Sequence, residues 1–189
     1  MRKHCFQQLP REYQEILHLD LQNDSKLILL VNGLATVIAL AMFAAGFLFT
    51  PMFAVFTSPP TLAAFLVCCV LYLVLHELVH GLCMKWFGAK RVRFGFTGLY
   101  AFAGSDEYFT KGAYVVVALA PVVVWGAVLL ALNVFAGEKL FGLFYLIQLI
   151  NVSGAAGDLY VCFRFWRLPR DILVRDTGVS MTVYGPEGA

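Results

Sequence analysis

The sequence predicts an all-α integral membrane protein in which four transmembrane helices form one domain. Hydrophobic residues make up 60% of the 189 residues, and the mean hydropathy is +0.77. Soluble domains are typically only about 45–50% apolar, and a chain of this length has too little interior to bury the excess. Two further observations support this fold class: four long apolar segments, and basic residues that gather outside them.

Each of the four apolar segments is long enough to cross a membrane. A helix needs roughly 20 residues to span a hydrocarbon core of about 30 Å. The expected spans are Leu27–Phe49, Leu62–Phe87, Gly112–Phe135 and Leu140–Phe163. The sequence therefore predicts a multi-pass protein.

Residues 27–165 are expected to form the four-span membrane domain, between an N-terminal segment, 1–26, and a C-terminal tail, 166–189. The N-terminal segment lacks a short apolar region followed by a cleavage site, which argues against a removed signal peptide. Its stretch "PREYQEILHLDLQ" favours a short amphipathic helix resting on the membrane surface. A plain solvated helix explains the pattern equally well.

The basic residues predict how the chain is oriented. Thirteen of the 14 Lys and Arg residues lie in the N-terminal segment, around the second connection or after the last span, and only Lys139 lies elsewhere. The positive-inside rule then places both termini and the 88–111 connection in the cytoplasm, in a cytoplasmic (inner) membrane. Lipid headgroups are the expected partners of this charge. The chain contains no motif for binding nucleic acid, and its oligomeric state is left open.

The connection "GAKRVRFGFTGLYAFAGSDEYFTKG" predicts a short β-hairpin on the cytoplasmic side, because residues alternate around "RVRFGF" and "LYAFAG". An edge strand there could bind an unwound substrate segment by strand addition. Alternatively, the hairpin lies on the headgroups. Pro121, in the third span, is expected to kink that helix, either to admit water or to fit a bend in the packing.

Four ionisable side chains are expected at membrane depth, where such groups are rare and usually functional. The second span contains His76, Glu77 and His80, and the fourth contains Asp158. The histidines are four residues apart, so on a helix they share one face and their imidazoles can reach a single cation. This HExxH pattern is typical of zinc peptidases, in which the two histidines bind the metal and the glutamate acts as general base.

Asp158 is the candidate third metal ligand. Counting from the outer ends of their spans, His76, His80 and Asp158 all lie roughly 20–27 Å deep at about 1.5 Å per residue. The small residues in "NVSGAAGDLY" would let the two helices approach closely. The alternatives are that Arg164 neutralises Asp158, or that Cys83, on the face of the histidines, is the third ligand.

Asn151 lies seven residues before Asp158, on the same helical face. It is a candidate catalytic residue, because its amide could bind a substrate carbonyl or an oxyanion in the transition state. A hydrogen bond between spans is an equal alternative. The chain contains five cysteines, an odd number, and none of them forms a CxxC pair. A disulfide framework is therefore not expected.

The phrases "HELVHG", "YFTKGAYVVVALAP" and "NVSGAAGDLY", with the four-span layout, resemble the small bacterial membrane proteins classed as "putative zincin peptidases". These are distantly similar to the site-2 intramembrane metalloproteases. The resemblance covers roughly residues 62–165. It implies that His76, His80 and Asp158 bind Zn²⁺ and that Glu77 is the general base. The chain departs from site-2 proteases in that Leu159 follows Asp158 and no proline lies nearby.

Together these observations predict a zinc-dependent metalloprotease embedded in the membrane. It would hydrolyse a peptide or transmembrane-protein substrate near the cytoplasmic face, after local unwinding of the substrate. One alternative is a membrane scaffold or chaperone with a structural or regulatory metal. Another is a small cation or proton transporter, although transporters more often show repeated halves or interrupted helices.

Overall fold

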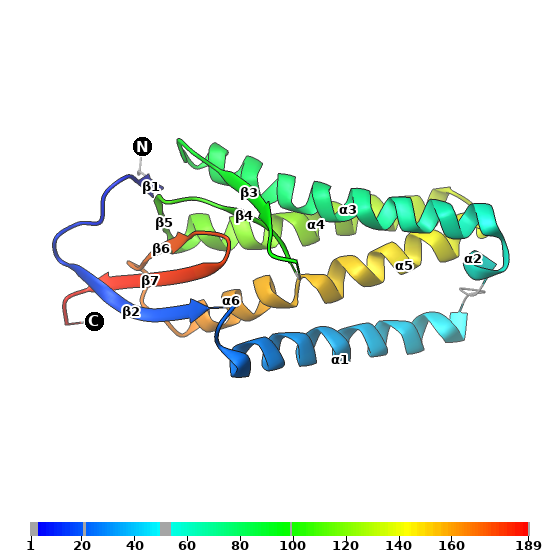
Figure 1. Cartoon of the computed structure of the whole chain (residues 1–189), viewed down its shortest axis with the longest axis horizontal. Helices are drawn as coiled ribbons and strands as arrows, with labels where there is room; N and C mark the ends of the chain where they lie inside the picture. Colours follow the sequence, from blue (N-terminus) through cyan, green and yellow to red (C-terminus); the bar gives the residue numbers. More distant parts are fainter. Residues whose placement is uncertain (1–3, 21, 50–53, 99, 189) are drawn as a thin grey trace. The chain divides into compact units, whose positions relative to one another are not determined.

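The computed structural model describes residues 4–20, 22–49, 54–98 and 100–188. Within these residues four helices are long and apolar enough to cross a membrane, as expected for a multi-pass membrane protein. The last span is made of two helices in succession. Figure 1 labels all the helices of the described residues. They are α1 (Ser25–Phe49), α2 (Ala54–Thr57), α3 (Pro59–Trp86), α4 (Lys111–Phe135), α5 (Glu138–Gly154) and α6 (Ala156–Trp166).

Local signals in the sequence set the ends of these helices. The Asp24 carboxylate accepts the backbone N–H groups of Lys26 and Leu27, which caps the start of α1. Helix α3 begins at a proline, whose missing N–H is not needed in the first turn. After α3 ends, Gly88 adopts φ 107°. The N–H of Ala89 donates a hydrogen bond to the Met84 carbonyl, which caps the C-terminus of the helix.

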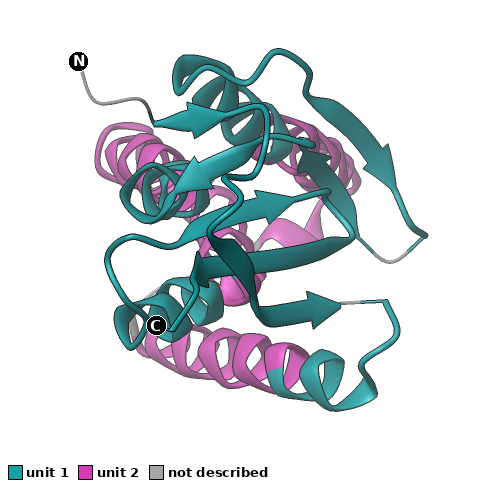
Figure 2. Ribbon diagram, turned by 90° about the vertical axis from the view of Figure 1, so that its left-hand side faces the viewer, with its two compact units in different colours: residues 1–30, 77–120, 158–189 teal, residues 31–76, 121–157 magenta. Residues whose placement is uncertain are grey.

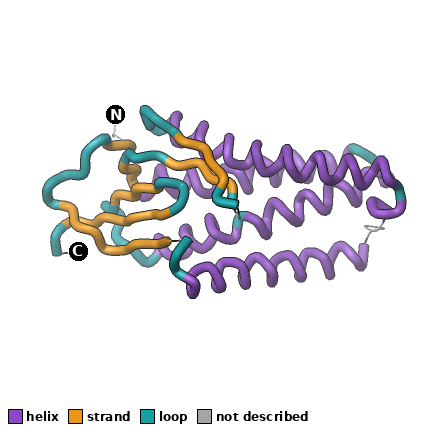
Figure 3. The backbone as a smooth tube through the Cα atoms, viewed as in Figure 1, coloured by secondary structure: helices purple, strands orange, loops and turns teal. Residues whose placement is uncertain are grey.

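The expectation of an all-α chain is wrong, because a five-stranded antiparallel sheet is also present. Its strand order is β1-β5-β6-β7-β2. The N-terminal segment, expected to be an amphipathic or solvated helix, instead forms strand β2. Figure 3 shows the strands in orange. The strands of this sheet are β1 (Cys5–Phe6), β2 (Tyr13–Asp20), β5 (Tyr108–Thr110), β6 (Leu173–Asp176) and β7 (Ser180–Pro186).

The predicted hairpin in the 88–111 connection is confirmed. Strands β3 (Arg93–Phe96) and β4 (Ala101–Gly104) pair antiparallel, with Arg93 opposite Gly104. The hairpin packs on α3 directly after the HExxH motif: a side chain at Gly81 would meet the Phe94 ring, which lies 2.4 Å from an ideal Cβ position. Glycine at this position therefore lets β3 approach the helix.

Two interruptions in the helices bear on the site. Helix α5 ends at Gly154 and α6 starts at Ala156, so the fourth span has a second helix N-terminus two residues before Asp158. In α4, Pro121 lies inside the helix, as expected, and carries no N–H. The Val117 carbonyl, four residues earlier, therefore lacks its usual helical donor.

The described chain divides into two compact units, coloured separately in Figure 2. The core of unit 1 contains an aromatic chain in which Tyr114 contacts both Phe109 and Phe165, and neither phenylalanine is exposed at all. In unit 2 the side chains of Tyr72, Leu129 and Ile147 form a buried cluster. Unit 1 comprises residues 1–30, 77–120 and 158–189, and unit 2 comprises residues 31–76 and 121–157.

Candidate metal centre

The two histidines of the HExxH motif lie one turn apart on α3. The boundary between the two units passes through this helix, directly after His76. Because α3 is continuous across the boundary, its regular geometry places His76 above His80 on one face. His76 is 8% exposed, and the side chain of His80 is 12% exposed. Two nearly buried imidazoles on one face need polar partners, and both have them.

The imidazole of His80 is oriented by the backbone of α4. Its Nδ1 lies 2.9 Å from the carbonyl oxygen of Val117, and because a carbonyl only accepts, Nδ1–H is the donor. This is the carbonyl that Pro121 leaves without a helical partner. In the neutral imidazole with its proton on Nδ1, the lone pair is on Nε2, which is the candidate metal-binding atom. Nε2 lies 3.6 Å from Oδ2 of Asp158.

Asp158 lies in the first turn of α6 and its side chain is 22% exposed. The break between α5 and α6 gives this carboxylate a place near a helix N-terminus, where the helix dipole stabilises negative charge. A continuous helix through Ala155 would offer no such position.

The imidazole of His76 makes its hydrogen bond within unit 2. Its Nδ1 lies 2.8 Å from the hydroxyl of Tyr72, one turn earlier on α3. That hydroxyl donates to Oδ1 of Asn151 at 2.9 Å. The two rings also contact edge to face, with centroids 5.6 Å apart. Because Nδ1 is hydrogen-bonded to Tyr72, Nε2 is the candidate metal-binding nitrogen of His76.

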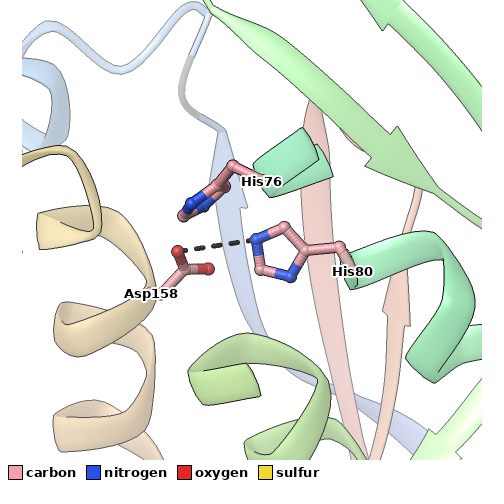
Figure 4. Close-up of side chains that lie close together, drawn as sticks. All are labelled: His76, His80 and Asp158. Carbon is pink, nitrogen blue, oxygen red and sulfur yellow. Dashed lines mark ion pairs between the residues drawn. The ribbon is translucent and has the colours of Figure 1, made fainter. Parts of the chain in front are cut away.

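These three residues form a group that fits one metal ion. Each of His76, His80 and Asp158 offers a ligand atom, and the three atoms lie within 4.8 Å of one another. Figure 4 shows the side chains pointing toward one another. Two ligands bound at about 2.0–2.1 Å to one tetrahedral ion lie about 3.3 Å apart, close to the 3.6 Å between His80 and Asp158. Two imidazoles and a carboxylate are a donor set typical of catalytic zinc.

The structure places the other predicted site residues as follows. Glu77 follows His76 on α3 and is partly buried. Asn151 has no exposed surface, and its Nδ2 donates to the Val122 carbonyl at 3.2 Å. Its amide therefore joins helices α3, α4 and α5, while its contact with a substrate stays a prediction. Among the described residues the metal-ligating group does not include Cys83, which lines an open apolar groove of about 200 Å³.

Two residues near the histidines escaped the sequence analysis. Tyr72 precedes His76 by one helical turn, and this spacing was the signal that could have revealed it. Asp176, in the predicted tail, accepts hydrogen bonds from the Tyr114 hydroxyl and from the Gly178 N–H. Burial raises the pKa of the Asp176 carboxyl, and these two hydrogen bonds oppose that rise. No local pattern marks Asp176, because its position depends on the pairing of β6.

A family model described as "Putative zincin peptidase" matches residues 69–173. This range contains the HExxH motif, the hairpin, Asn151 and Asp158. Comparison with curated proteins finds no match, and neither does comparison with solved structures.

Proposed function

The chain belongs to the zincin peptidase family, and on that premise we propose that it is a zinc-dependent peptidase working within or at a membrane. The observation that carries the proposal is the convergence of His76, His80 and Asp158, with the general base expected of a zincin next to His76 in the sequence. The four apolar helices support the membrane location. The distribution of basic residues supports cleavage near the cytoplasmic face of the cytoplasmic membrane.

In this proposal His76, His80 and Asp158 would hold the metal ion. When bound, zinc supplies Lewis acidity, which polarises a carbonyl and lowers the pKa of water to about 7. Glu77 takes the proton from the attacking water and then delivers it to the leaving amine. The hydrogen bonds on both Nδ1 atoms keep the imidazoles turned toward the metal during these steps.

Strand β3 is the candidate site for the substrate backbone. It packs against α3 at Gly81, the residue that follows His80. Among the described strands it pairs only with β4, which leaves its outer edge available. A substrate segment in extended conformation would add to this edge and present its peptide bonds beside the histidines. A transmembrane substrate helix must therefore unwind locally before it is cut.

The test separates metal binding from catalysis. The full chain is purified in detergent and reconstituted in vesicles with single-span model proteins as the substrates. Glu77→Gln keeps the shape of the side chain but is a far weaker base, so it should retain stoichiometric zinc and cut about 10²–10⁴-fold more slowly. His76→Ala should lose the metal. Undiminished cleavage by metal-loaded Glu77→Gln would contradict the assigned base, and wild-type protein without stoichiometric metal would contradict the zinc site.

A further inference from the structure

A chain of hydrogen bonds inside unit 2 leads from the backbone of α4 to His76. The Nδ2 group of Asn151 donates to the Val122 carbonyl at 3.2 Å and to Oε1 of Gln148 at 3.5 Å. Its Oδ1 accepts from the Tyr72 hydroxyl, which also bonds Nδ1 of His76. Tyr72 is 5% exposed and Asn151 is not exposed at all, so water does not compete for these groups.

The chemistry of these groups fixes the direction of every bond in the chain. A backbone carbonyl only accepts, so the amide of Asn151 must present Nδ2 to Val122 and Oδ1 to Tyr72. Oδ1 also only accepts, so the single hydroxyl proton of Tyr72 points to Asn151. The Tyr72 oxygen is then the acceptor toward His76, and Nδ1 of His76 must carry the proton. In the neutral imidazole the lone pair therefore lies on Nε2.

We propose that Asn151, acting through Tyr72, is a positioning residue that selects the metal-binding tautomer of His76. This inference rests on the proposed function, because it assumes that His76 is a metal ligand. Without the amide oxygen of Asn151, the Tyr72 hydroxyl is released to donate to Nδ1 of His76 instead. The imidazole then carries its proton on Nε2, and that nitrogen has no lone pair for a metal.

A merely structural role for the same bonds makes a different prediction. Bonds that only hold α3, α4 and α5 together would lower stability when removed and leave the metal affinity of the folded protein unchanged. A positioning role acts on metal affinity itself. Loss of a partner that orients a metal-bound histidine typically weakens metal binding about 10–100-fold. Metal affinity, rather than activity, is therefore the readout.

The experiment measures the zinc Kd of the purified full chain by competition with a chromophoric chelator. Tyr72→Phe removes one oxygen and keeps the ring, so it should fold and bind zinc about 10–100-fold more weakly. Asn151→Leu should weaken binding in the same way. In the Tyr72→Phe background, Asn151→Leu should cause no further loss of affinity, because its effect passes through Tyr72. The control is Tyr145→Phe, which removes a hydroxyl that donates to the Met42 carbonyl within unit 2.

Wild-type zinc affinity in Tyr72→Phe, or additive losses in the double variant, would overturn the inference and leave the metal site standing. Wild-type protein that binds no stoichiometric zinc would overturn both the metal site and the inference. If the affinities change as expected but wild type cuts no substrate, the positioning role holds and the proposed peptidase activity fails.

Discussion

Replacing Pro121 with alanine should make the protein more stable and at the same time a weaker metal binder. Proline in α4 leaves the Val117 carbonyl without its helical donor, and His80 Nδ1 occupies that carbonyl at 2.9 Å. In Pro121→Ala the new N–H of residue 121 lies in the correct position to bond Val117. His80 then shares its acceptor with the helix, and the carbonyl turns back toward the helix axis.

The two effects can be estimated separately. Proline in a helix interior costs about 3 kcal/mol. Pro121 is fully buried, and removing two ring carbons loses about 1.6 kcal/mol of apolar burial. The metal-free variant should thus be more stable by about 1–2 kcal/mol. One neutral hydrogen bond is worth about 0.5–1.5 kcal/mol net, so full loss of the His80 bond would weaken zinc binding about 2- to 13-fold.

The assay pairs thermal unfolding of the metal-free protein with a zinc competition titration. Pro60→Ala is the matched control, because Pro60 lies in the first turn of α3, where no helical hydrogen bond is missing. A variant that gains stability and binds zinc as tightly as wild type would refute the reasoning. The proline would then serve the packing of α4 and have no effect on the imidazole.

Two further predictions test the fold and the metal site. Gly104→Ala should destabilise the protein by at least about 1–3 kcal/mol in thermal unfolding, because the added Cβ would lie 2.2 Å from the backbone of Thr177. The control is Gly33→Ala, whose added Cβ would have no other atom within 4 Å, so its stability should change by less than about 1 kcal/mol. Equal losses of stability in the two variants would contradict the packing of β4. Zinc at 100 times its Kd should stabilise wild type by about 2.7 kcal/mol, and a chelator should reverse this. His80→Ala should show no such shift, and a full shift in that variant would contradict the ligand assignment.

The four long apolar helices and the grouping of the candidate metal ligands could be predicted because most of their signals are local. Hydropathy locates a span within its own 20 residues, and the HExxH spacing places His76 and His80 on one face of a single helix. The prediction of Asp158 required one more step, in which its depth in the fourth span was compared with the depth of the histidines in the second. Asp158 lies in the same group as the histidines. The break before Asp158 was not foreseen, because "SGAAG" was interpreted as a surface for close packing.

The sheet could not be predicted from local patterns. Strand β2 pairs with β7, so that Tyr13 lies opposite Pro186, and two-residue β1 pairs with β5. These strands gain their stability from partners far along the chain, whereas periodicity reports only on neighbours. "YQEILHLD" therefore favoured a helix until the strand beside it was known. Tyr72 escaped for a related reason, since a tyrosine in an apolar span looks like packing until Asn151 is placed next to it.

The pairing of β2 with β7 also sets the order in which the protein can be completed. During translation all four hydrophobic helices are made before the ribosome reaches residue 173, where β6 begins. Until β6 and β7 emerge, β5 has no inner neighbour and β2 has nothing to pair with. The sheet of unit 1 therefore becomes complete only after the last strand has been synthesised, when all four long apolar helices are already in the chain.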